Sequence, residues 1–219
     1  MALTTLVVLG LCGCHGKDRD VAENGSQGAG LAPASSAQEN DGKSARGSGA
    51  TSPTGDTTAQ AETPLLRAVR SGDLNAAQSL IAKGADVNAN NLLLRTPLHE
   101  ASFGDRKQIA ELLVAKGANV NAKDMLGLTP LHAAVLAGSK PMTAFLLLKG
   151  ADINARSDTG QTALHLAAAT GELSIAELLI RHGANPGLQD HKGRTASFYA
   201  SRNGHKETAT LLTAKGVAR

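Results

Sequence analysis

Apolar residues recur along this chain with helical spacing and a long period. Three clusters place large apolar side chains three residues and then one residue apart, which puts each cluster on one face of an α-helix. The clusters are Ile109, Leu112 and Leu113; Met142, Phe145 and Leu146; and Ile175, Leu178 and Leu179. A lighter pair precedes each cluster, such as Leu131 and Ala134 before the second. The pattern predicts two short helices per unit, the second with the larger apolar load.

Five similar phrases mark the start of the first helix in each unit. They begin at Thr63, Thr96, Thr129, Thr162 and Thr195, so each unit is 33 residues long. Threonine suits the position before a helix, and the proline that follows it in the first three phrases suits the first turn. A period in this range indicates a solenoid, in which each unit buries its apolar face against its neighbours.

The predicted end of the first helix is a glycine in four units. These are Gly72, Gly138, Gly171 and Gly204, each suited to a left-handed residue after a helix. The second unit has Asp105 at this position. Because Asp tolerates the left-handed conformation better than most residues, we expect a strained but intact turn there.

The unit resembles the ankyrin repeat, on the phrases Thr-Pro-Leu-His-x-Ala and Gly-Ala-Asp-x-Asn-Ala. Repeat three shows both most fully, at residues 129–134 and 150–155. The resemblance covers residues 58–219 as five repeats. It implies an all-α fold, a solenoid of stacked helix pairs with projecting β-hairpin-like loops. It also implies a non-catalytic protein-binding module whose partner docks on the concave side and the loop tips.

The end units carry a lighter apolar load than the middle ones. The last unit has Thr208, Leu211 and Leu212 in its second helix, and the first unit has Ala76, Ser79 and Leu80. A polar outer face is what the end of a solenoid needs. We therefore expect a complete five-repeat domain that is capped at both ends.

The N-terminus resembles a bacterial lipoprotein signal peptide. Residues 1–11 are mostly apolar and uncharged, and the sequence Leu11-Cys12-Gly13-Cys14 follows the lipobox pattern. The resemblance implies a signal peptide over residues 1–13 and a lipidated Cys14. His15 favours the outer membrane, although no Lys or Arg follows Met1 as it does in most signals. The alternative is a buried apolar strand with incidental cysteines.

Residues 14–57 are predicted to be a disordered tether. Gly, Ser, Ala and short polar residues dominate, and only Val21 and Leu31 are sizeable apolar side chains. Such a segment cannot bury enough surface to offset its chain entropy. A Gly-rich coil of this kind holds a domain near a membrane and lets it search around its anchor. The alternative is a low-complexity insertion without a role.

No residue pattern points to catalysis, a cofactor or a metal. His99, His132 and His165 occupy equivalent positions in successive units, but stacked helices lie roughly 8–10 Å apart, too far for neighbouring histidines to share an ion. The resemblance implies that this histidine is structural. The pI near 9.0 suggests nucleic acid, but aromatic residues make up only 2% of the chain, which leaves no platform for bases. We expect no enzyme activity, nucleic-acid partner or small-molecule substrate.

The resemblance places partner-binding residues at the loop tips and the ends of the first helices. Repeats two and three put apolar side chains at most of these positions, while repeats four and five are polar and basic. A contiguous apolar patch of this kind marks an interaction surface. The predicted contacts are Leu92, Leu93, Arg95, Phe103, Met125, Leu126, Leu128, Leu136, Asp158, Gln161, Lys192 and Arg194.

The loop of repeat two lacks the expected turn glycine and has Leu94 instead, so we predict a distorted loop. The alternative for the loop leucines is that they fold back onto the loop bases or are covered by the tether.

These features predict a membrane-tethered lipoprotein of the bacterial envelope that faces the periplasm and binds another protein or a second copy of itself. One role is an inhibitor or immunity factor that masks a partner's active site. A second is a scaffold or chaperone-like support for an envelope enzyme. A third, if the leader is not a signal, is a cytoplasmic adaptor.

Overall fold

Residues 62–216 are described by the computed structural model of the chain, and they form ten helices in five pairs. The first helices are α2 (Pro64–Ser71), α4 (Pro97–Phe103), α6 (Pro130–Leu136), α8 (Ala163–Thr170) and α10 (Ala196–Arg202). The second helices are α3 (Leu74–Ala82), α5 (Lys107–Ala115), α7 (Lys140–Leu148), α9 (Leu173–Arg181) and α11 (Lys206–Gly216). The predicted all-α solenoid is confirmed.

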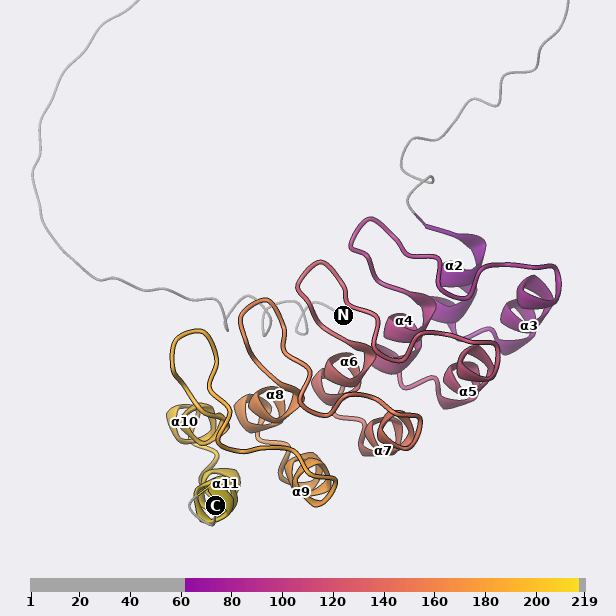
Figure 1. The fold of residues 1–219 in the computed structure, drawn as a ribbon. Helices are drawn as coiled ribbons and strands as arrows, with labels where there is room; N and C mark the ends of the chain where they lie inside the picture. The colour runs from indigo at the N-terminus through magenta and orange to yellow at the C-terminus, as the bar shows by residue number, and fades with distance from the viewer. Residues whose placement is uncertain (1–61, 217–219) are drawn as a thin grey trace, which may run out of the picture. The chain divides into compact units, whose positions relative to one another are not determined.

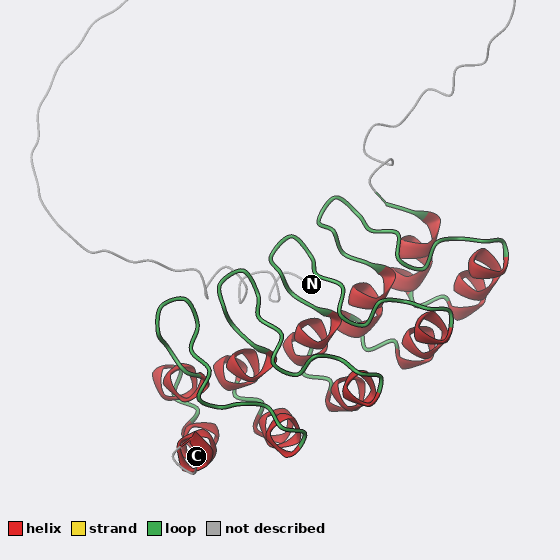
Figure 2. Ribbon diagram, viewed as in Figure 1, coloured by secondary structure: helices red, strands yellow, loops and turns green. Residues whose placement is uncertain are grey.

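The helices stack in two rows. One row holds the first helices, the other holds the second helices, and the long loops project beyond the first-helix row (Figure 1). Each first helix packs against its own second helix and against the first helix of the next repeat. In the described residues the loops form no β-strand, and only an isolated bridge joins Gln189 to Thr195 (Figure 2). The loops are thus hairpin-like in shape without a strand ladder.

The core repeats with the 33-residue period. Leu98, Leu131 and Leu164 are almost completely buried in successive first helices. The alanine three residues after each of them is also buried, as at Ala101 and Ala134. Because alanine has the smallest side chain after glycine, it lets neighbouring helices approach closely, and the leucines then fill the remaining space.

The ends of the first helices follow the predicted pattern. Gly72, Gly138 and Gly171 have φ angles between 69° and 78°, in the left-handed region. Asp105 adopts the same conformation with a φ of 52°, which confirms the expected strained but intact turn. Its carboxylate accepts a hydrogen bond from the hydroxyl of Ser139 at the start of α7 in the next repeat. That contact offsets part of the strain.

The two end helices bury little. In α3 only Ala77 is buried, and in α11 only Thr208 and Leu212 are buried. This confirms the lighter apolar load predicted for the two end units. The predicted signal peptide, Cys14, the tether and the domain boundary at residue 58 lie outside the described residues.

Candidate protein-binding surface

Each projecting loop is held by a polar residue at its base. The Oδ1 atom of Asp124 accepts hydrogen bonds from the backbone N–H groups of Leu126 and Leu128, both at 2.9 Å. Asn91 does the same in repeat two with Leu93 and Arg95, at 2.9 and 3.0 Å. An Asx side chain that satisfies two backbone donors fixes the course of a tight loop. The conformation of each loop is therefore fixed by hydrogen bonds between the residue at its base and the loop backbone. The side chains at the tip are not needed to hold it.

Leu94 keeps the loop of repeat two in the common shape. Its φ is 56°, beside 68° for Gly127 and 79° for Gly160 at the equivalent positions. Its N–H donates to the carbonyl of Asn91 at 2.9 Å, as that of Gly127 does to Asp124. The predicted distortion is wrong, because the loop's hydrogen bonds force leucine into the left-handed conformation that glycine adopts elsewhere. For a residue with a Cβ that conformation costs roughly 1–2 kcal/mol.

Backbone hydrogen bonds tie the loop tips into a row. The N–H of Met125 donates to the carbonyl of Leu93 at 2.9 Å, and the N–H of Asp158 donates to the carbonyl of Leu126 at 3.0 Å. The same bond links His191 to Thr159 at 3.0 Å. Neighbouring tips are therefore held side by side, and apolar residues on the tips of repeats two and three form one surface.

That surface is apolar and exposed. Five side chains share it, with exposed fractions between 47% and 75%: Leu92, Leu93, Leu94, Met125 and Leu126. We call these five residues the fingertip patch. The leucines do not fold back onto the loop bases, so that half of the alternative is wrong, while cover by the tether concerns residues outside the described range. Leu94, which the loop pattern indicated only as a substitute for glycine, is also a surface residue, and the run of three leucines was a signal for it.

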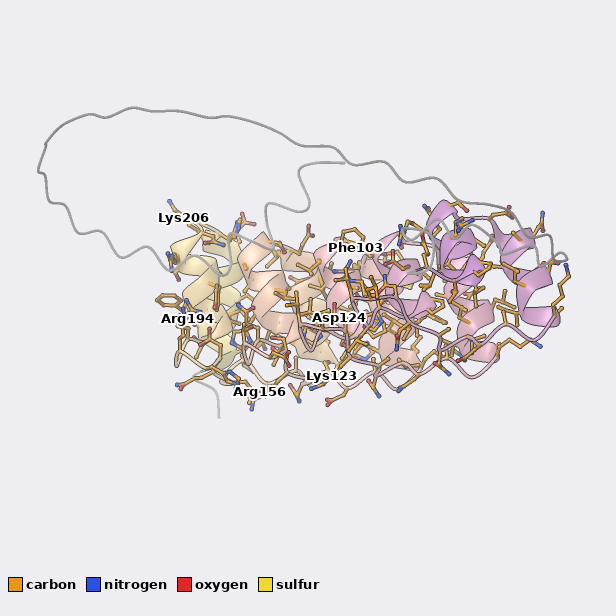
Figure 3. All side chains as sticks on the ribbon, turned by 90° about the horizontal axis from the view of Figure 1, so that it is seen from above. Phe103, Lys123, Asp124, Arg156, Arg194 and Lys206 are labelled. Carbon is orange, nitrogen blue, oxygen red and sulfur yellow. The ribbon has the colours of Figure 1, made fainter. Side chains whose placement is uncertain are left out.

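Other predicted apolar contacts lie apart from the fingertip patch. Phe103, at the end of α4, is 40% exposed, and Figure 3 places it on the edge of the stack away from Lys123 and Arg156. Leu136, at the end of α6, and Leu128 are half-buried. A partner that touched both the patch and Phe103 would have to cross the row of first helices.

Arg95 anchors the apolar loops to each other. Its Nε lies 3.4 Å from Oδ2 of Asp124 in the next repeat, and the Asp124 side chain is almost completely buried. Oδ1 of Asp124 therefore holds its own loop, while Oδ2 of the same carboxylate faces Arg95. The main role of Arg95 is thus to join two neighbouring loops, and its role as a partner contact is secondary.

The polar half of the predicted site is partly buried. Gln161 is only 7% exposed, and its Nε2 donates to the hydroxyl of Tyr199 at 2.9 Å. The prediction of an exposed Gln161 is wrong, because the tyrosine of the next repeat reaches across and covers it. Asp158 and Lys192 are exposed as expected.

Arg194 is engaged inside its own loop. Its Nη2 lies 2.7 Å from Oδ2 of Asp190, and its guanidinium carbon lies 4.8 Å from the centre of the Tyr199 ring. Burial by itself would raise the pKa of Asp190, but hydrogen bonds from Arg194 and Tyr199 hold that pKa well below its usual range. Asp190 thus stays ionised, and Arg194 acts mainly as a structural partner.

The three equivalent histidines connect successive repeats. The backbone N–H of Thr129 donates to Nδ1 of His132 at 3.1 Å, so Nε2 carries the proton and donates to the carbonyl of Gln161 at 3.3 Å. His99 and His165 make the same two contacts, with Leu128 and Arg194 as acceptors. Burial lowers the pKa of all three, and that of His132 falls to about 4. The prediction of a structural histidine is confirmed.

A comparison with protein families identifies the architecture. The family described as "Ankyrin repeats (3 copies)" matches the chain over residues 48–124, 65–157 and 131–218. The chain belongs to the ankyrin-repeat family. Ankyrin repeats are protein–protein interaction modules and are in general not catalytic. No curated protein matches this ankyrin-repeat chain.

Two further features of residues 62–216 concern membranes and metals. No helix in this range is long and apolar enough to cross a membrane. The same range contains no group of three or more His, Cys, Asp or Glu side chains placed to hold a metal ion. Of the eight large apolar side chains that are exposed in the described residues, five belong to the fingertip patch.

Proposed function

We propose that this ankyrin-repeat protein binds another protein through the fingertip patch of repeats two and three. Leu94 carries the proposal. It is 47% exposed and strained at a position where repeats three to five have glycine. A strained backbone that carries an exposed apolar side chain is typical of functional positions. A partner that covers Leu94 would bury the exposed leucine, a gain that the isolated protein does not have.

The size of the patch sets limits on the partner. Burying three leucines contributes on the order of 5 kcal/mol before the costs of association are subtracted. A stable interface buries about 800 Å² on each side, which is more than five side chains provide. The partner must therefore reach further, toward Phe103 and Leu136 across the first helices or toward Asp158 and Lys192 along the loops.

Crosslinking in the native host tests the site. The double variant Leu93→Lys and Leu126→Lys should lose a protein that the wild-type chain captures. Gln108→Lys with Ser174→Lys is the matched control, since it adds the same charge at exposed positions of α5 and α9. Equal capture by all three chains would show that the fingertip patch is not the binding site.

We also propose that the protein is tethered through Cys14 in the bacterial envelope, in the outer membrane and facing the periplasm. The support is the sequence from Leu11 to Cys14, which resembles a lipobox. Mass spectrometry of the mature N-terminus is the direct test. A diacylglyceryl-modified Cys14 supports the tether, whereas an intact Met1 makes the protein a cytoplasmic adaptor.

The proposed role is to mask the active site of the partner, as an inhibitor or immunity factor. The alternative role is a scaffold or chaperone-like support. A purified one-to-one mixture separates them, because a masking protein abolishes the partner's activity and a scaffold leaves it intact or raises it.

A further inference from the structure

A second surface lies on different elements from the fingertip patch. The helices α3, α5, α7 and α9 are each followed directly by a basic C-cap residue: Lys83, Lys116, Lys149 and His182. Because the second helices stack side by side (Figure 1), their C-terminal ends follow one edge of the repeat domain. All four side chains are exposed. We call Lys83, Lys116 and Lys149 the lysine row.

The ammonium groups of the lysine row have no carboxylate partner within residues 62–216. Other cations near this edge are already engaged with backbone. Lys123 donates to the carbonyl of Arg156 at 3.1 Å, and Arg156 donates to the carbonyl of Gln189 at 2.6 Å. Figure 3 shows Lys123 and Arg156 along one edge of the stack. In the lysine row, Nζ of Lys149 lies 5.8 Å from the centre of the Phe145 ring, a contact with an aromatic face that leaves its charge without a counter-ion. The lysine row is thus positive charge at this edge that no carboxylate in residues 62–216 neutralises.

The edge is also rigid. Asn88 accepts from the N–H of Asn119 at 2.8 Å and donates to the carbonyl of Gly117 at 3.2 Å. Asn121 makes the same pair of bonds with Asp152 and Gly150. Gly117 and Gly150 directly follow two lysines of the row, so the spacing between the lysines is fixed.

An apolar groove opens beside the lysine row. It has a volume of about 720 Å³, lies between α5 and α7, and is lined by Val114, Pro141, Phe145 and Leu148 among others. Leu148 is 77% exposed, the largest exposure among the large apolar side chains described. Lys149 borders the groove at one place, and the ion pair between Lys107 and Glu111 borders it at another.

The helix dipole explains only part of this arrangement. A cation at the C-terminal end of a helix is favourable in itself, which accounts for one lysine per repeat. It does not account for Leu148, whose equivalents in the first, second and fourth repeats are Ala82, Ala115 and Arg181. Among these four equivalent positions, only Leu148 places a large exposed apolar side chain beside the groove.

We propose that this edge binds an anionic lipid surface, with the lysine row at the headgroups and Leu148 in the acyl region. Basic residues beside an exposed apolar side chain are the signature of interfacial membrane binding. Identical cations one repeat apart suit a surface that presents the same anionic group everywhere. A lipid surface supplies both an anionic headgroup for each lysine and an acyl region for the groove, so the observations favour lipid over an acidic protein.

Cosedimentation with vesicles tests the proposal. The full chain carrying Cys14→Ser is mixed with vesicles of about 30% phosphatidylglycerol in phosphatidylcholine, and with pure phosphatidylcholine. We expect stronger binding to the anionic vesicles. Each lysine near such a surface contributes roughly a fivefold gain in partitioning, so Lys83→Gln, Lys116→Gln and Lys149→Gln together should lower binding about a hundredfold. Leu148→Ser should lower it several-fold.

A charge-matched control removes three cations from the opposite edge: Lys140→Gln, Arg202→Gln and Lys206→Gln. Figure 3 places Lys206 away from Lys123 and Arg156. This control should lose far less binding than the lysine-row variant. Equal losses would overturn the proposal, since net charge alone would then explain the binding.

Other outcomes also decide the proposal. No preference for anionic vesicles would overturn it, and retention on polyglutamate without vesicle binding would assign the lysine row to an acidic protein instead. An unchanged Leu148→Ser variant would overturn insertion at the groove. The proposal does not rest on the fingertip patch, and the Leu93→Lys and Leu126→Lys double variant should therefore still bind vesicles.

Discussion

The hydroxyl of Tyr199, on α10, donates a hydrogen bond of 2.6 Å to Oδ2 of Asp190 in the loop of the last repeat. The same hydroxyl accepts the amide of Gln161 from the repeat before. One side chain thus joins two neighbouring loops and covers the position that the sequence suggested as a partner contact. Polar side chains therefore join the loops of repeats four and five to each other, whereas the loops of repeats two and three expose apolar side chains.

Replacing Tyr199 by Phe should lower the free energy of unfolding by about 1–3 kcal/mol. The change leaves the amide of Gln161 and one oxygen of Asp190 short of a partner in a buried place. Urea unfolding measures the effect. In a double-mutant cycle with Gln161→Leu, the two changes should be clearly non-additive. Additive changes would mean that the two side chains do not interact in solution.

Replacing Leu94 by Gly should leave the protein at least as stable as the wild type, with a gain of up to about 1 kcal/mol. Glycine removes the cost of the left-handed conformation but loses more chain entropy on folding. Partner capture should nevertheless fall, because an exposed leucine is lost from the fingertip patch. Urea unfolding and the crosslinking experiment together check this. A clear loss of stability would show that Leu94 packs within the fold.

Two substitutions at Asp105 separate the effect of its left-handed backbone from the effect of its side-chain hydrogen bond. Asp105→Ala keeps the left-handed strain and removes the hydrogen bond from Ser139, so we expect a loss of about 2 kcal/mol. Asp105→Gly removes both the bond and the strain, and should cost clearly less. Thermal or urea unfolding of the pair makes the comparison. An alanine variant that is as stable as the glycine variant would mean that the left-handed backbone at residue 105 carries no strain.

The stability of the domain should fall as the pH drops from about 6.5 to about 4. Burial lowers the pKa of His132 to about 4 from an ordinary value of 6.5, so the unfolded chain binds more protons across this window. The stabilisation is complete above pH 6.5, and this histidine alone accounts for a loss of about 3 kcal/mol by pH 4. His99 and His165 act in the same direction.

Urea unfolding at several pH values tests this, with His132→Asn as the comparison. The variant should be less stable at pH 7, because it loses the bridge to Gln161, and its stability should depend less on pH. Asp190 does not confuse the result, since its pKa is held below its usual range and its contribution is lost only at lower pH. A variant with the wild-type pH dependence would contradict the role of His132 in it.

The repeat, its helices and its family could all be predicted from the amino-acid sequence. The reason is that these features are local and periodic: Thr129 and Pro130 start a helix, Leu131 and Ala134 share its buried face, and Gly138 ends it. Five copies of one pattern leave little freedom in the fold. The placement of Leu93 and Leu126 at the loop tips could also be predicted from the sequence, because it follows from the 33-residue period.

Tertiary structure decided which of those positions are available to a partner. Gln161 is buried because Tyr199, 38 residues later, reaches it, and no spacing within one repeat contains that information. Leu94 keeps the shape of its loop because Asn91 holds the backbone, and it is therefore exposed rather than displaced. Leu148 stands beside a groove that exists only between two stacked helices. Exposure depends on what the neighbouring repeats place around a residue, and that is settled only when the repeats pack.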